Sequence, residues 1–404
     1  MLRLRDQLAG KPIRFHCVET TRDLAEVADF IKRHRWLGID TESTGINCYR
    51  IGWELRTVQY GNARESYVVP QRFRKFIAWS MRQRVNWIGH NGPHDIRSID
   101  EHLGYSTGVV CAGETYIPAH HNDSRGIREG GTGHGLKELA EFHIDRDAGK
   151  WERELKRVFK TIEIPMPGQF YKSGPRKGLP KVRKAKLDEG WGLIDPMHPA
   201  YIAYAAADPI LAYLMWKHYR PVLHEFRERY EFDHRVQMVC DRLQRRAIPL
   251  DVNYTEVLSE AFTTKADRYI KRAKEYGCKN IHSGKQIADT LLDLGARLTA
   301  RTPTGQYQTS DAILRKILNK AKADRQAERN ESSLYIEDFI RSVLIAKQLL
   351  KRRENYTDAM LREMDRNGRI HPSINTLGAR TTRMSVSKPA LQQLPTKDRD
   401  DEGE

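Results

Sequence analysis

Short apolar runs alternate with helix-like stretches over residues 1 to about 145, and this alternation limits the possible folds more than any other feature of the sequence. Each run has the length of a buried strand and is bounded by polar or turn-forming residues. The runs are Trp36–Ile39, Leu55–Tyr60, Tyr67–Val69 and Trp87–Gly89, the last of them followed by Asn91-Gly92-Pro93. Strands mixed with helices in this way predict an α/β domain.

From Ala203 onward the apolar residues follow helical spacing instead. Those between Ile336 and Leu344 are spaced as i, i+3, i+4, i+7 and i+8, which predicts an amphipathic helix packed on a core. Near the end, Arg369–Asn375 and Ala379–Ser385 are interpreted as strands, and an acidic tail follows from Asp398. The sequence therefore predicts a mostly helical region after the α/β domain.

Charge and hydropathy restrict the partners and the location. The 404 residues carry a formal net charge of +16, which favours a polyanion such as nucleic acid, although a merely basic surface is the alternative. No apolar run approaches the roughly 18 to 20 residues that cross a bilayer, and the first residues lack the apolar segment of a signal peptide. We expect no membrane partner and a cytoplasmic location. The five scattered cysteines indicate neither a disulfide framework nor a structural zinc site.

Residues 147–195 interrupt the α/β pattern. Within them, 151–190 contain 11 Lys or Arg and 5 Asp or Glu, together with several prolines and glycines. One interpretation is a solvated surface insertion, and the other is a mobile basic loop that contacts a phosphate backbone. The sequence leaves both interpretations open.

Three acidic segments can carry chemistry. Asp40 and Glu42 lie two residues apart at the end of an apolar strand and therefore on the same side of it. Asp95 opens a predicted helix after a turn, and Tyr204 and Asp208 share one helical face at i and i+4. Taken singly, each has an ordinary explanation, such as a chance Asp-x-Glu triplet or an acid that interacts favourably with a helix dipole.

Together the four acids indicate a metal centre. Carboxylates placed side by side repel one another unless a cation compensates. Asp40, Glu42, Asp95 and Asp208 can hold two Mg²⁺ or Mn²⁺ ions, which activate a water and stabilise the leaving oxygen of a phosphodiester. Tyr204 would orient the attacking water. We predict these five residues as the catalytic set.

The same residues resemble the three motifs of the DEDD superfamily of 3′–5′ exonucleases. Asp40-Thr41-Glu42 resembles the first motif, Asn91 to Asp95 the second, and Tyr204 to Asp208 the third. The tyrosine implies the DEDDy branch, because the histidine branch would have His where Ala203 stands. The resemblance implies a ribonuclease H-like mixed sheet with helices, and two-metal hydrolysis.

The second half resembles the thumb and the start of the palm of family A (polymerase I-like) DNA polymerases, of bacteriophage type. The resemblance rests on Ser283–Gln286, Arg301–Ser310, Asn355–Asp358 with Gly368–Ser373, and Thr381–Ser385 with Pro389–Pro395. By carry-over, Arg383 and Gln392 would contact the primer–template, and Lys351 and Arg353 its backbone. Asn91 and Lys285 are the remaining predicted DNA contacts. The implied domains are an exonuclease domain over 1–225 with the insertion at 147–195, a helical thumb over 226–365, and the start of a palm with an acidic tail over 366–404.

This sequence departs from the family pattern at three places. Thr382 stands where the family has glycine, and His94 where it favours Tyr or Phe. The polymerase motifs that would follow Pro395 are missing, so we expect no polymerisation by this chain alone. A second chain carrying the polymerase palm and fingers is a possible partner.

The prediction from sequence is therefore a metal-dependent 3′–5′ exonuclease with a proofreading role. Its partners would be primer–template DNA and a single-stranded 3′ end, in the cytoplasm of a bacterial host if the origin is a phage. The alternatives are a catalytically idle DNA-binding subunit of a split polymerase and a DEDDy ribonuclease.

Overall fold

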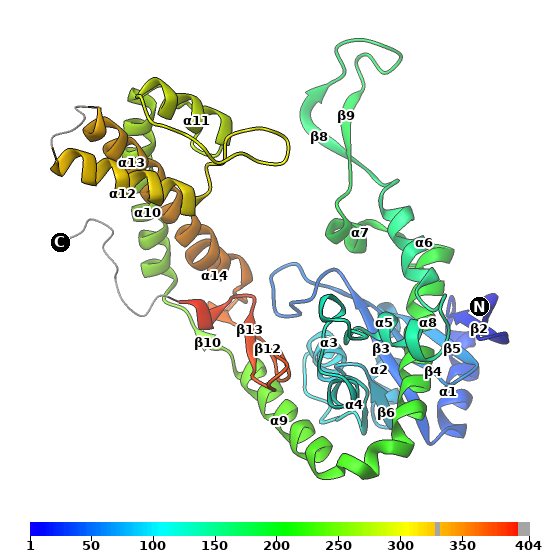
Figure 1. Ribbon diagram of the computed structural model, residues 1–404. Helices are drawn as coiled ribbons and strands as arrows, with labels where there is room; N and C mark the ends of the chain where they lie inside the picture. The colour runs from blue at the N-terminus through cyan, green and yellow to red at the C-terminus, as the bar shows by residue number, and fades with distance from the viewer. Residues whose placement is uncertain (328–331, 395–404) are drawn as a thin grey trace. The chain divides into compact units, whose positions relative to one another are not determined.

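The computed structural model describes residues 1–327 and 332–394 (Figure 1), and the chain forms two compact units. The first unit consists of Met1–Ala247 and Ser373–Ser385. The second unit consists of Ile248–Pro372 and the residues that follow from Val386. Pro395 and the acidic tail, which sequence analysis assigned to the start of a palm, lie outside the described residues. No helix in the described ranges is both long enough and apolar enough to span a bilayer.

A seven-stranded mixed sheet forms the centre of the first unit, with the strand order β1-β2-β5-β4-β3-β6-β7. Strands β2 and β5, β3 and β6, and β6 and β7 pair in parallel, and the other neighbours pair antiparallel. The strands are β1 Leu2–Leu8, β2 Lys11–Cys17, β3 Trp36–Ser43, β4 Leu55–Gly61, β5 Glu65–Pro70, β6 Asn86–Gly89 and β7 Gly113–Glu114. All four strands predicted from the sequence lie within β3, β4, β5 and β6, which confirms the α/β prediction.

Helices cover both faces of this sheet. Side chains of α1, α2 and α3 pack in one core cluster, and those of α5, α6 and α8 pack in another. Val68 and Val69 are neighbours in β5 but belong to different clusters, because successive strand residues point to opposite faces. The helices are α1 Leu24–Arg33, α2 Arg74–Ser80, α3 Pro93–Leu103, α4 Tyr116–Asn122, α5 Leu136–His143, α6 Lys150–Phe159, α7 Leu187–Leu193, α8 Pro199–Tyr219 and α9 Arg227–Arg246.

The basic insertion has regular structure. It contains α6, then the antiparallel strands β8 Glu163–Phe170 and β9 Pro180–Lys184, then α7. The two strands form a separate sheet of their own, and in Figure 1 this hairpin stands apart from the seven-stranded sheet. Of the two interpretations left open, the loop does not describe this segment, because the chain pairs with itself as an antiparallel hairpin in which Pro165 lies opposite Val182 and Pro180 opposite Phe170.

The second unit is mainly helical. Its helices are α10 Val252–Glu275, α11 Gly284–Asp293, α12 Asp311–Gln326, α13 Ser333–Arg352, the π-helical turn Arg353–Thr357 and α14 Asp358–Glu363, and β10 Ile248–Pro249 pairs with β11 Arg369–Ile370. The stripe between Ile336 and Leu344 is buried in a core shared with α11 and α12, which confirms that helix prediction.

The last predicted strand is largely wrong. Strand β12, Ser373–Asn375, pairs with β13, Ser385–Ser387, but the residues before β13 form a turn rather than a strand. The Thr382 N–H donates to the Ala379 carbonyl at 2.9 Å, and Thr382 has a φ of 58°. A positive φ reverses the chain and is incompatible with an extended strand.

Candidate metal centre

Strand β3 carries the first two acids of the site. Gly38, Asp40 and Glu42 alternate with Leu37 and Ile39, which belong to the core on the other side of the sheet. The alternation places both carboxylates on the side of β3 that faces α8. Asp208 is in α8, so a helix and a strand must approach closely to complete the site.

Two glycines permit this approach. A Cβ atom at Gly38 would lie 2.8 Å from the carbonyl carbon and 3.0 Å from the Cα of Pro209, which follows Asp208 in α8. A Cβ at Gly61 of β4 would lie 3.1 Å from the Pro209 Cβ. Side chains at these positions would push α8 away from the sheet. The result of the close packing is that carboxylate oxygens of Asp40, Glu42 and Asp208 all lie within 4.8 Å of one another.

Asp95 adjoins this cluster from a third element. It is buried in the first turn of α3, and its Oδ1 accepts a hydrogen bond from the Thr41 hydroxyl at 2.7 Å. Thr41 lies between Asp40 and Glu42 on β3. The structure therefore brings together three of the four predicted acids directly and attaches the fourth through Thr41.

The electrostatics of the cluster favour a cation. Burial raises the pKa of Asp40 well above its ordinary value, and Asp95, Asp208 and Glu42 raise it further. Burial likewise raises the pKa of Glu42, with Asp208 adding to the effect. Asp40 Oδ2 and Asp208 Oδ1 are buried and have no hydrogen-bond partner among the described residues. Buried, unpartnered carboxylate oxygens are costly without a cation, and oxygen ligands of this kind suit Mg²⁺ or Mn²⁺.

One lysine inside the site was missed from the sequence. Lys137 Nζ donates to Asp208 Oδ2 and, at 3.1 Å, to the Tyr204 hydroxyl, and it lies 4.3 Å from the Tyr204 ring centroid. Burial lowers the pKa of Lys137, but Asp208 and Asp40 outweigh burial and raise it above its ordinary value. Lys137 is in the first turn of α5, where the helix dipole disfavours a cation, so its contact with Asp208 compensates for an unfavourable position.

A second missed residue supports the turn before Asp95. Both carboxylate oxygens of Glu114, on β7, accept hydrogen bonds at 2.8 Å, one from the Asn91 N–H and one from the Gly92 N–H. Asn91 has a φ of 63°, so these bonds stabilise a backbone conformation that is unfavourable for a residue with a side chain. Burial raises the pKa of Glu114 to about 7. Glu114 thereby fixes the start of α3 and the position of Asp95.

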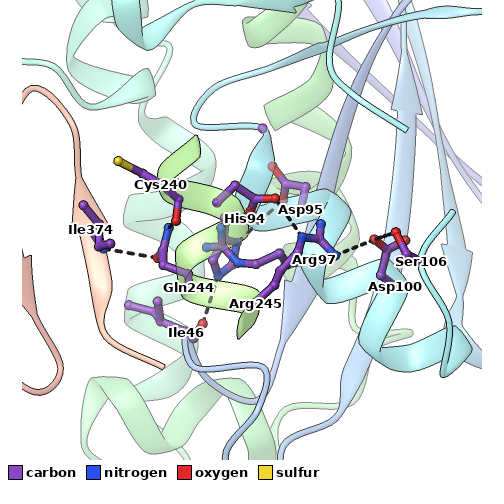
Figure 2. Close-up of polar contacts among 12 residues, drawn as sticks. Ile46, His94, Asp95, Arg97, Asp100, Ser106, Cys240, Gln244, Arg245 and Ile374 are labelled. Carbon is purple, nitrogen blue, oxygen red and sulfur yellow. Dashed lines mark hydrogen bonds and ion pairs between the residues drawn. The ribbon is translucent and has the colours of Figure 1, made fainter. Parts of the chain in front are cut away.

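Helix α3 is also attached to α9 by a chain of ion pairs. Asp241 of α9 pairs with Arg97 and with Arg245, and Arg245 Nη1 lies 2.6 Å from Asp100 Oδ2 (Figure 2). His94, where Tyr or Phe was expected, makes a 3.0 Å hydrogen bond through Nε2 with the Ile46 carbonyl (Figure 2). The helix that presents Asp95 is therefore restrained on both sides of that residue.

Comparison with known proteins identifies the relatives of this chain. The family model for DNA polymerase family A matches residues 252–404. The DNA polymerase of Mycobacterium phage L5 is 28% identical over 409 residues, and that of Mycobacterium phage D29 is 27% identical over 414; each match covers 98% of this chain. The chain is similar to DNA polymerases of family A over nearly its whole length, and its residues 252–404 match that family's model. It spans 62% of the length of each of these two phage relatives.

One solved structure has a similar fold. It is described as the POL domain of Pol1 from M. smegmatis in complex with DNA primer-template and dNTP. The match has a TM-score of 0.56 and 14% sequence identity, and it covers 95% of this chain and 56% of that chain. The likeness at this identity concerns the fold.

The predicted DNA contacts are divided between the two units, and Asn91 lies just before α3, which carries Asp95. Lys285 and Lys351 are exposed in the second unit, and Arg383 is exposed in the first. Arg353 pairs with Asp358 at 3.0 Å and also donates to Thr263. The Gln392 side chain accepts a hydrogen bond from the Val386 N–H at 3.0 Å. Arg353 and Gln392 therefore have structural contacts in addition to any contact with DNA.

Proposed function

We propose that this chain carries a metal-dependent 3′–5′ exonuclease that trims DNA ends and releases nucleoside 5′-monophosphates. The observation that supports the proposal best is the convergence of Asp40, Glu42 and Asp208 within 4.8 Å. One buried oxygen of Asp40 and one of Asp208 have no hydrogen-bond partner in the part of the chain that the structure describes. Phosphodiester hydrolysis at such a site needs divalent cations and a water held in line with the leaving oxygen.

Each residue of the metal centre would have a distinct role in hydrolysis. Asp40, Glu42 and Asp208 would hold the ions, with Asp95 beside them. Mg²⁺ or Mn²⁺ bound there would supply a Lewis acid and an activated water. The Tyr204 hydroxyl is fixed by Lys137 at 3.1 Å and is available to orient the attacking water through its other lone pair. Because burial raises the pKa of Tyr204 well above its ordinary value, the phenol stays protonated at neutral pH.

We also propose that the second unit and the segment from 373 to 385 bind the primer–template duplex. The match of residues 252–404 to DNA polymerase family A supports this role. The net charge of +16 supports it as well, since phosphate contacts release condensed counterions. The candidate contacts are Lys285, Lys351, Arg353, Arg383 and Gln392.

The test uses a 5′-labelled DNA primer with a mismatched 3′ end, and the RNA strand of the same sequence. We expect the parent chain with Mg²⁺ to shorten the DNA one nucleotide at a time. The variant Asp40→Ala/Glu42→Ala should bind the primer but leave it intact. A matched control is Asp29→Ala/Glu101→Ala, which removes two exposed acids from α1 and α3.

Other outcomes would select the alternatives. Trimming of the RNA strand in preference to DNA would indicate a ribonuclease. Binding of the primer without trimming by the parent chain would indicate a DNA-binding subunit that is catalytically idle. If the control variant lost trimming to the same extent as Asp40→Ala/Glu42→Ala, the assignment of Asp40 and Glu42 as catalytic residues would be contradicted.

A further inference from the structure

We propose that the β8–β9 hairpin binds single-stranded DNA and guides its 3′ end to the metal centre. The guiding role rests on the proposed exonuclease function, but the binding can be measured without any hydrolysis. Four observations carry the inference: the charge of the hairpin, its exposed apolar tip, its separation from the core, and the anchoring of its base against Tyr204.

Basic residues strongly outnumber acidic ones in the hairpin. Residues 163–186 contain seven Lys or Arg and a single acid, Glu163. Glu163 pairs with Lys184 at 2.9 Å and with Arg176 at 3.8 Å, and Arg183 pairs with Glu189 of α7 at 2.7 Å. The lysines that have no ion pair with any described residue include Lys172, Lys177 and Lys181. Such uncompensated cations fit a phosphate backbone.

The tip of the hairpin adds apolar surface to this charge. Phe170 ends β8 with 55% of its surface exposed, and Leu179, just before β9, is also 55% exposed. Tyr171 lies next to Phe170 and is half-buried. Proteins that hold single strands combine cations that follow the backbone with aromatic rings on which the bases stack. A duplex keeps its bases inside, so the exposed ring favours a single strand as the occupant.

The hairpin contributes little to the stability of the fold. Among the described strands, β8 and β9 pair only with each other, and side chains of β8 are at most half-buried. An isolated two-stranded hairpin is marginally stable in water. The hairpin therefore exposes aromatic and apolar surface that does not pack on a core. Exposed apolar surface of this kind is typical of a binding element.

The base of the hairpin is fixed beside the metal centre. Trp191 of α7 packs on Tyr204, with ring centroids 5.3 Å apart, and on Phe159 of α6 at 5.1 Å. A Cβ at Gly190 would lie 2.6 Å from Phe159 Cδ2, so glycine is needed for this packing. Arg56 of β4 donates to the carbonyls of Trp191 and Ile194 and attaches α7 to the sheet. A strand that follows the hairpin to its base therefore arrives next to Tyr204.

The experiment measures binding of the full chain to a fluorescent 20-nucleotide oligo-dT strand in EDTA, by anisotropy at several salt concentrations. The variant is Lys172→Ala/Lys177→Ala/Lys181→Ala, whose side chains have no ion pairs to disturb. Loss of three phosphate contacts should reduce the slope of log K against log salt by about 2, since each contact with a single strand contributes about 0.7. The control, Lys11→Ala/Lys75→Ala/Arg84→Ala, makes the same change in charge at exposed positions outside the hairpin and should leave the slope unchanged.

A second variant tests the aromatic tip without any change in charge. Phe170→Ala should weaken binding of the oligo-dT strand roughly tenfold, because one base loses its stacking partner. Tyr105→Ala, which removes another exposed aromatic ring, is the matched control and should bind as the parent does.

Several results would overturn the proposal. They are an unchanged slope in the triple lysine variant, an equal loss in its control, and tighter binding of oligo-rU than of oligo-dT. If the parent chain hydrolyses DNA, the lysine variant should lose rate on a 20-nucleotide strand but keep it on a dinucleotide too short to reach the hairpin. If the parent hydrolyses nothing, the exonuclease proposal fails while the binding result still decides the role of the hairpin.

Discussion

A single methyl group at Gly38 should separate the two elements that form the metal centre. In Gly38→Ala the new Cβ would lie 2.8 Å from the Pro209 carbonyl carbon and closer still to its oxygen, whereas ordinary contacts begin near 3.4 Å. Strand β3 or helix α8 must move by at least about half an ångström, and overpacking of this kind costs about 1–3 kcal/mol. Asp208 precedes Pro209 and would move with it, away from Asp40 and Glu42.

The chain offers a graded set of controls for this variant. A Cβ at Gly61 would lie 3.1 Å from the Pro209 Cβ, so Gly61→Ala should have a smaller effect of the same kind. A Cβ at Gly45 would meet nothing within 4 Å, so Gly45→Ala should be neutral. Urea unfolding measures the stability, and Mn²⁺ binding and DNA trimming measure the site. Since a misplacement of about 1 Å can cost about 100-fold in rate, we expect the order Gly45→Ala, Gly61→Ala, Gly38→Ala in increasing loss. If Gly38→Ala is as stable and binds Mn²⁺ as tightly as Gly45→Ala, the close approach of α8 is not what forms the site.

Three further predictions follow from the same structure. Lys137→Met removes the only cation that contacts Asp208 among the described residues. It should lower the free energy of unfolding by on the order of 3 kcal/mol without metal, but by less with saturating Mn²⁺. An equal loss in both conditions would show that Lys137 does not compensate the charge of the acids. Thr382→Gly should raise the free energy of unfolding by about 1 kcal/mol in urea titrations, because Thr382 has a φ of 58° that glycine adopts without strain. The control Thr381→Gly should lower the free energy of unfolding. A lower free energy of unfolding in Thr382→Gly would show that the backbone at Thr382 is not strained. The raised pKa values of Asp40 and Glu42 mean that their contribution to metal-free stability is complete below their ordinary pKa values and is lost as the pH rises through the raised ones. Because protons and metal compete for the same oxygens, Mn²⁺ should raise the melting temperature more at pH 8 than at pH 6. The reverse order would exclude these carboxylates as ligands.

The parts of the site that sequence could predict are those set by local pattern. Asp40 and Glu42 follow an apolar run that ends a strand, and the i, i+4 spacing of Tyr204 and Asp208 puts them on one face of a helix. Both patterns depend only on neighbouring residues. The contact of Asp208 with the two acids of β3 also depends on Gly38, whose role is visible only once α8 is packed against the sheet.

Long-range contacts account for what the sequence did not reveal. Lys137 reaches Asp208 from 71 positions away, and Glu114 of β7 reaches Asn91, which follows the neighbouring strand β6 and is 23 positions away. The ion pairs of Asp241 with Arg97 join helices that are 144 positions apart. No periodicity or spacing indicates such pairs. The hairpin was missed for a different reason, because its prolines and glycines are as typical of a loop as of two short strands.

The central claim is that the cluster around Asp40 releases nucleotides from DNA 3′ ends. The most direct measurement uses a DNA strand labelled at the phosphate of its 3′-terminal nucleotide and follows the released product over time with Mg²⁺, with EDTA, and with the Asp208→Asn variant. We expect the label to appear as a nucleoside 5′-monophosphate with Mg²⁺ only, and Asp208→Asn to release it at least 100-fold more slowly. Release of the label in longer fragments, or release by Asp208→Asn at the parent rate, would contradict the account.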